Sequence, residues 1–204
     1  MAMMLELTVY YYGASAISLL IFVACFVANQ KYRSAIDSSL ASVDRVPPFK
    51  VPERLRSYDA DYLNAFKAAA MTQGTRFGRT VLELYIKPTL LWIDVCFAIS
   101  MASFVALFWS GVHAWFPQSR LIGDVSEFCL AMAIAYGIAD VAEDVWLARL
   151  LSQAGPVSKG GAAVACRLTQ LKFVTISLSV VGGFLFVLLS AIFRDARDPH
   201  RLTA

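Results

Sequence analysis

The chain has 204 residues, of which 58% are hydrophobic and 16% charged, and its formal net charge is +3. Water-soluble globular domains contain about 45–50% apolar and about 25% charged residues, so this composition indicates a membrane protein. The 13% of aromatic residues and the small net charge exclude an intrinsically disordered chain.

Four apolar segments are long enough to cross a bilayer as helices, which takes about 20 residues. They cover residues 7–28, 88–116, 128–148 and 173–193. None shows the alternation of a transmembrane β-strand, so the chain is predicted to be an all-α, polytopic membrane protein with four transmembrane helices in a bundle. Residues 1–204 are expected to form a single membrane domain.

The first span resembles a signal peptide in position but not in sequence. No lysine or arginine precedes it, and no small-residue cleavage site follows it. Secretory signal peptides have both features. We therefore expect residues 7–28 to be a retained helix.

The first connection, residues 29–87, is too long for a plain loop and is predicted to contain helices. Apolar residues recur at helical spacing after the first span: Tyr32, Ile36, Leu40 and Val43. This spacing predicts an amphipathic, cytoplasmic extension of the first helix, which should end at Pro47 and Pro48. Two more helical segments are expected between residues 57 and 85, on or under the membrane surface, with a break at Gly74.

The basic residues are unevenly distributed, and this sets the expected orientation. Of the 18 lysines and arginines, ten lie in the 29–87 connection and four between the third and fourth spans. Cytoplasmic loops are enriched in these residues, so a multi-pass protein of the inner (plasma) membrane with both termini outside the cytoplasm is predicted. Four basic residues of the first connection either contact anionic lipid or form a solvated face: Lys67, Arg76, Arg79 and Lys87.

The third span carries three acidic residues. Asp140, Glu143 and Asp144 stand at i, i+3 and i+4, so they share one face of a helix. A charge in the bilayer costs at least ~2.5–3.5 kcal/mol, so these acids should point into the bundle. Small residues on the same stripe, among them Ala133 and Gly137, favour the close approach of a neighbouring helix.

Lys172 is the expected counter-ion of these acids. It lies five residues past Arg167, near which the fourth helix is predicted to begin. A stripe of small residues follows it along that helix: Thr175, Ser179 and Gly183. Such a stripe packs against another helix, so Lys172 should face inward.

Asp94 of the second span should lie at a similar depth, because it is seven residues past Lys87. We therefore predict a buried ion or proton cluster. Its members are Asp94, Asp140, Glu143 and Lys172, with Asp144 and Arg149 nearer the cytoplasmic surface. The residues alone leave open whether this cluster fixes the helices or serves transport, binding or catalysis.

The run from Ala139 to Asp144 resembles the D-x-x-E-[ND] signature of a group of uncharacterised four-helix bacterial membrane proteins. Two further features are similar: Asp94 followed by Phe97, and the pair Lys172-Phe173. The chain departs from the pattern at Asp144, where the group more often has asparagine. The resemblance implies a four-helix integral membrane protein and this cluster, and it implies no activity.

Several chemistries have no support in the sequence. The four cysteines form no C-x-x-C pair, and the two histidines lie in no haem or di-iron pattern, so no cofactor is expected. A carboxylate-only metal site at Asp94, Asp140 and Glu143 stays open, with the metal unknown. Residues 158–161 are expected to be a flexible cytoplasmic loop. A sequence pI of about 8.7 gives no reason to expect a nucleic-acid partner.

Three functions fit these features. The first is a non-catalytic structural or accessory subunit whose cluster orients the bundle or receives a partner helix. The second is a small oligomeric transporter coupled to protons or cations. The third is an intramembrane enzyme acting on lipid, with Asp140 and Glu143 as acid and base or through a metal. The expected partners are the lipid bilayer and a second copy of the chain or another membrane protein.

Overall fold

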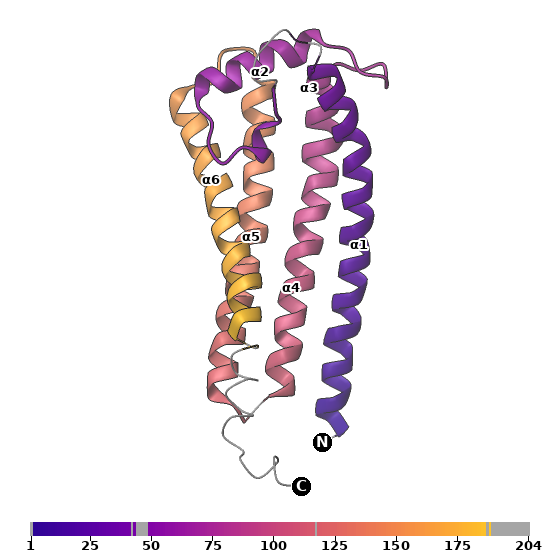
Figure 1. Cartoon of the computed structure of the whole chain (residues 1–204), viewed down its shortest axis with the longest axis vertical. Helices are drawn as coiled ribbons and strands as arrows, with labels where there is room; N and C mark the ends of the chain where they lie inside the picture. Colours follow the sequence, from indigo (N-terminus) through magenta and orange to yellow (C-terminus); the bar gives the residue numbers. More distant parts are fainter. Residues whose placement is uncertain (1, 42, 44–48, 117, 187, 189–204) are drawn as a thin grey trace.

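The computed structural model describes residues 2–41, 43, 49–116, 118–186 and 188. Four long helices run side by side (Figure 1). They are α1 (Ala2–Leu40), α4 (Val95–Trp115), α5 (Arg120–Ser152) and α6 (Lys159–Ser177). The shorter elements are η1 (Pro52–Arg54), α2 (Ala60–Thr72), α3 (Val81–Leu84), η2 (Tyr85–Asp94) and η3 (Leu178–Gly182). The described ranges contain no β-strand, which confirms the all-α prediction.

The four helices pack in chain order. Helix α1 packs along α4, α4 along α5, and α5 along α6, whereas α1 and α6 are not packed along each other in the described part of the chain. Four helical segments are long and apolar enough to cross a membrane, as the sequence predicts: Val9–Leu40, Val81–Trp115, Arg120–Ser152 and Lys159–Phe186. The bundle is therefore open on the side between its first and last helices.

A short helix precedes the predicted start of the second span at residue 88. Thr80 caps α3 in a capping box with Glu83, and the backbone leaves the helical conformation at Lys87 (φ −134°, ψ 118°). Pro88 follows this kink and has no backbone N–H to donate, and the hydroxyl of Thr89 donates to the carbonyl of Leu84 over 2.9 Å. The helix that continues into α4 therefore begins at Pro88, which agrees with the predicted start.

The fourth long helix begins earlier than predicted. Ser158 caps α6, and its hydroxyl accepts from the backbone N–H of Gly161 over 3.1 Å, so residues 159–161 form the first helical turn instead of a loop. A Cβ at Gly161 would lie 2.7 Å from a methyl group of Leu150. The glycine therefore serves close packing of α6 on α5. Residues 187 and 189–193 of the predicted span lie outside the described residues.

The expected extension of the first helix is confirmed. Helix α1 runs without interruption to Leu40, and Ile36 and Leu40 are fully buried. The predicted stop at Pro47 and Pro48 lies outside the described residues. Helix α2 and the start of α3 match the two further helical segments, and α2 ends at Thr72, close to the break predicted at Gly74.

Helix α2 lies across one end of the bundle, as Figure 1 shows. Its buried side chains join those of α1, α3 and α5 in the larger of two apolar cores, which includes Leu63, Phe66, Ile36, Leu84 and Leu147. Lys67 is buried there and donates to the carbonyls of Gln153 and Gly155, the latter over 3.0 Å. A lysine suits the negative end of a helix, so Lys67 caps α5 and does not contact lipid.

Small residues set the helix spacing, as the sequence predicts. A Cβ at Gly137 of α5 would lie 2.7 Å from the Cβ of Ala102 of α4. A Cβ at Gly183, after α6, would lie 1.9 Å from the ring of Trp109 of α4. Both glycines therefore let backbones approach where any larger side chain would collide.

Candidate functional site

Three of the predicted residues form a closed ion pair between α5 and α6, which we call the paired set: Asp140, Glu143 and Lys172. The Lys172 ammonium lies 2.9 Å from Oδ1 of Asp140 and 2.5 Å from Oε2 of Glu143. All three residues are buried, with exposed fractions of 7%, 0% and 8%. The prediction that Lys172 is the counter-ion of the third-span acids is confirmed for Asp140 and Glu143 and not for Asp144.

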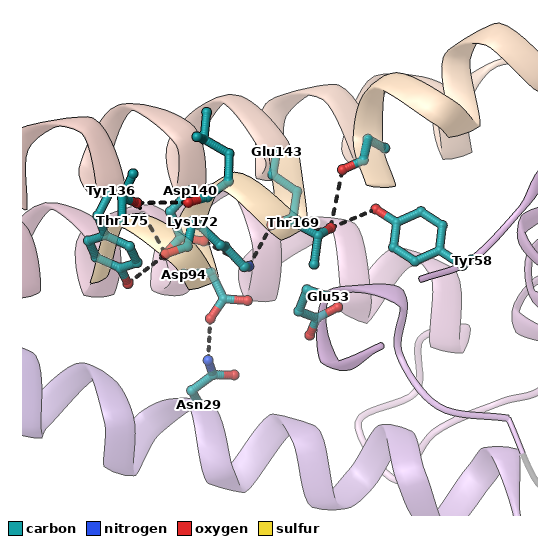
Figure 2. Close-up of polar contacts among 12 residues, drawn as sticks. Asn29, Glu53, Tyr58, Asp94, Tyr136, Asp140, Glu143, Thr169, Lys172 and Thr175 are labelled. Atoms are coloured by element: carbon teal, nitrogen blue, oxygen red, sulfur yellow. Dashed lines mark hydrogen bonds and ion pairs between the residues drawn. The ribbon is translucent and has the colours of Figure 1, made fainter. Parts of the chain in front are cut away.

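The other oxygens of the paired set also have partners (Figure 2). The Tyr136 hydroxyl donates to Oδ2 of Asp140 over 2.7 Å, and the Thr169 hydroxyl donates to Oε1 of Glu143. A threonine hydroxyl has one proton, so the Tyr58 hydroxyl, 3.1 Å from that of Thr169, is the donor of the next bond. A relay of hydrogen bonds thus runs from the first connection to the buried Glu143.

Tyr58 lies in the connection between η1 and α2 and is itself buried. Burial raises the pKa of its phenol well above the usual value, so it stays protonated and can donate. The spacing on α5 and α6 predicted the paired set, whereas the participation of Tyr58 depends on how the connection folds over the bundle.

Asp94 is buried beside the paired set, as the predicted cluster requires, but it forms no ion pair with Lys172 in the described structure. Its partners come from α1: the Asn29 amide donates to its Oδ1, and Arg33 Nη2 lies 3.4 Å from the same oxygen. The reason is that η2 packs against α1 as well as α5. Figure 2 shows Asp94 between Asn29 and the paired set.

Glu53 is a member that the sequence analysis missed. This η1 residue accepts a hydrogen bond from the Tyr85 hydroxyl through Oε2, and its Oε1 lies 3.9 Å from Arg33. It is only 7% exposed. Asn29 and Arg33 lie on the buried stripe of α1 that contains Ile36, and that periodicity could have revealed them. Glu53 stands in a short turn after Pro52, where no periodicity exists to identify it.

Asp144 is more deeply buried than predicted. It is 1% exposed instead of lying near the surface, because α5 continues to Ser152 and the first connection covers that end of the bundle. Arg149 is exposed, as expected. Asp144 makes no side-chain hydrogen bond or ion pair with any residue that the structure describes.

Glu53, Asp94 and Asp144 together are called the open set. Each has a buried carboxylate oxygen that accepts no hydrogen bond from the described residues: Oε1, Oδ2 and Oδ2, respectively. All three line a cavity of about 400 Å³. Its other lining residues are Arg33, Arg54, Phe97, Tyr136, Asp140, Lys172, Phe173 and Ile176. Five buried carboxyl groups thus lie around two buried or half-buried cations, Arg33 and Lys172.

The arrangement differs from a preformed metal centre. Within the described ranges, no group of three or more histidine, cysteine, aspartate or glutamate side chains is placed to hold a metal ion. Asp140 and Glu143 use their oxygens on Lys172, Tyr136 and Thr169. The paired set can hold α5 and α6 together, and the open set can accept hydrogen bonds from a cation.

Comparisons of the chain with protein-family models, with curated proteins and with solved structures found no match.

Proposed function

We propose that this chain is a multi-pass protein of a bacterial inner membrane, with both termini outside the cytoplasm, and that it acts as a structural or accessory subunit without catalytic turnover. The four long apolar helices support membrane insertion. The orientation is supported by the lysine- and arginine-rich connections, which lie together at one end of the bundle (Figure 1).

The closed paired set carries the structural part of this proposal. Its carboxylates and ammonium are all engaged inside the protein, and they join α5 to α6. Removing one partner from a buried ion pair leaves an uncompensated charge, which destabilises a protein by about 3–5 kcal/mol. If the paired set serves structure, substituting one of its residues should therefore lower the abundance of the protein in membranes.

The test compares Asp140→Asn, Lys172→Met and the double variant with two exposed controls, Asp124→Asn and Lys159→Met. Abundance in membranes and thermal stability in detergent are measured for each. A structural pair predicts losses in both single variants, with Lys172→Met the worse, and partial recovery in the double variant. Normal abundance and stability in all three cluster variants would contradict the proposal.

A small oligomeric transporter coupled to protons or cations is the second candidate, and the open set favours it. Unpartnered carboxylates around a cavity within the spans are typical of ion pathways. In proteoliposomes, this candidate predicts proton or cation flux that Asp144→Asn abolishes and Asp124→Asn leaves intact. An enzyme using Asp140 and Glu143 as acid and base has less support, because Lys172 engages both carboxylates.

Membership of the four-helix group with the D-x-x-E-[ND] signature is part of the proposal. The placement of Asp140, Glu143 and Lys172 in one ion pair supports it, since the signature then has a physical reason. A second copy of the chain or another membrane protein is the proposed partner. The open side between α1 and α6 supports this, because a fifth helix could pack there.

A further inference from the structure

We propose that the cavity lined by the open set binds an organic primary ammonium group. The argument starts from its three carboxylates, which are at least nine-tenths buried: Glu53 is 7% exposed, Asp94 6% and Asp144 1%. Each presents one buried oxygen without a hydrogen bond from the described residues. Buried polar atoms are normally hydrogen-bonded, so these three oxygens are acceptors that a ligand with N–H donors would satisfy.

The number of free acceptors matches the donors of a primary ammonium. Such a group has three N–H bonds and no acceptor. Glu53, Asp94 and Asp144 offer three oxygens that accept no hydrogen bond from the described residues, on three different elements: η1, η2 and α5. Arg33 is the only cation that contacts Glu53 and Asp94 in the described structure, at 3.9 and 3.4 Å, and no described cation contacts Asp144.

The size and the remaining walls of the cavity favour an organic ion over a bare metal ion. Its volume of about 400 Å³ is within the range of small-molecule sites, about 300–1,000 Å³. Phe97, Phe173 and Ile176 line it together with the carboxylates. An ammonium on a hydrocarbon chain would place its N–H groups against the carboxylates and its carbon atoms against these apolar side chains. The faces of aromatic rings also attract cations.

The position of the cavity allows two sources of this ammonium group. The cavity is lined by Arg33 of α1 and by Phe173 and Ile176 of α6, the two helices that do not pack along each other. Phe173 is 46% exposed, so the cavity reaches the surface of the bundle. A soluble amine could enter there, and so could the headgroup of an aminophospholipid with its chains left in the bilayer.

The experiment measures binding to the purified full-length chain in detergent by calorimetry. The probes are n-butylammonium, tetramethylammonium, K⁺ and Mg²⁺ at matched ionic strength. We expect saturable binding of n-butylammonium only, because tetramethylammonium has no N–H donor. Asp144→Asn and Asp94→Asn should each weaken it at least about tenfold, since each removes one charged acceptor, and the exposed control Asp124→Asn should leave it unchanged.

Nanodiscs containing ethanolamine or choline phospholipid distinguish the two sources. If ethanolamine lipid competes with n-butylammonium and choline lipid does not, the ligand is a lipid headgroup; if neither competes, it is a soluble amine. Binding of neither the amine nor the ethanolamine lipid would overturn the proposal. Equal binding of tetramethylammonium or a metal ion would do so as well, as would unchanged affinity in Asp94→Asn and Asp144→Asn.

Glu53→Gln provides a third test if an aspartate variant does not fold. The inference holds for an accessory subunit and for a transporter alike. It is measured as equilibrium binding, whereas the structural proposal is measured by the Asp140 and Lys172 variants, so the failure of one is distinguishable from the failure of the other.

Discussion

The paired set and the open set lie in one cluster and share helix α5, yet their carboxylates have opposite surroundings. Asp140 and Asp144 are one helical turn apart, and both are buried. Asp140 contacts an ammonium and a phenol, whereas Asp144 has no partner among the described residues. Burial alone therefore does not say whether an acid stabilises a helix bundle. The partner decides it, because a buried charge without one costs folding free energy.

The largest expected effect comes from removing the cation of the paired set. Lys172→Met leaves Asp140 and Glu143 without their shared counter-ion, so the free energy of unfolding should fall by about 3–5 kcal/mol. Thermal or denaturant unfolding in detergent measures this change. Lys159→Met is the matched control, since this exposed lysine lies in the first turn of the same helix and should change stability little. Equal stability of the two variants would show that the ion pair does not hold the bundle.

The second effect tests whether helix spacing keeps the paired set closed. Gly183→Ala would place a Cβ 1.9 Å from the Trp109 ring, which forces α6 and α4 apart and should cost about 1–3 kcal/mol. At the adjacent Gly182 nothing lies within 4 Å of a new Cβ. Gly182→Ala should therefore be neutral or stabilising by up to about 1 kcal/mol, since alanine favours the helix. Similar unfolding midpoints for both variants would mean that the protein accommodates a methyl group beside Trp109 without losing stability.

The third effect concerns the relay from the first connection. Tyr58→Phe removes the donor to Thr169 and leaves the rest of the ring in place, so stability should fall by about 0.5–1.5 kcal/mol. Tyr10→Phe is the control, because Tyr10 is 68% exposed. Urea or heat unfolding followed by intrinsic fluorescence measures both variants. An equal loss of stability in Tyr10→Phe would show that removing any tyrosine hydroxyl has this effect, and that the relay does not cause it.

The sequence predicted the part of this cluster that depends on local periodicity. Asp140 and Glu143 had to share a face of α5, and the small residues after Lys172 placed it on the inner face of α6. Periodicity could have placed Asn29 and Arg33 on the buried stripe of α1, but not their pairing with Asp94, because that depends on α1 packing along η2, a contact between residues 65 positions apart. Glu53 was missed for a related reason, since a turn residue becomes buried only when its connection folds over the bundle.

The helix boundaries show the same division between local and tertiary information. Gly160 and Gly161 suggested a flexible loop, because glycine is a poor helix former. The structure places them in a helix, where the Ser158 cap satisfies the backbone and Leu150 leaves no space for a larger side chain at position 161. Pro88 indicated a helix start, and the backbone is not helical at the preceding Lys87. A tertiary contact overrides the local preference at Gly161, whereas the local preference holds at Pro88.

The smallest effect on stability should come from the open set, and it separates the two sets most directly. Asp144→Asn makes the same chemical change as Asp140→Asn one turn earlier on α5. No described partner is lost at Asp144, and a buried charge is replaced by a neutral amide, so stability should stay within about 1 kcal/mol or rise. Asp140→Asn should be destabilising under the same conditions, because it weakens an ion pair and the bond from Tyr136. If Asp144→Asn proves the more destabilising of the two, then Asp144 has a structural partner in the folded protein, and the open set is not kept free for a ligand.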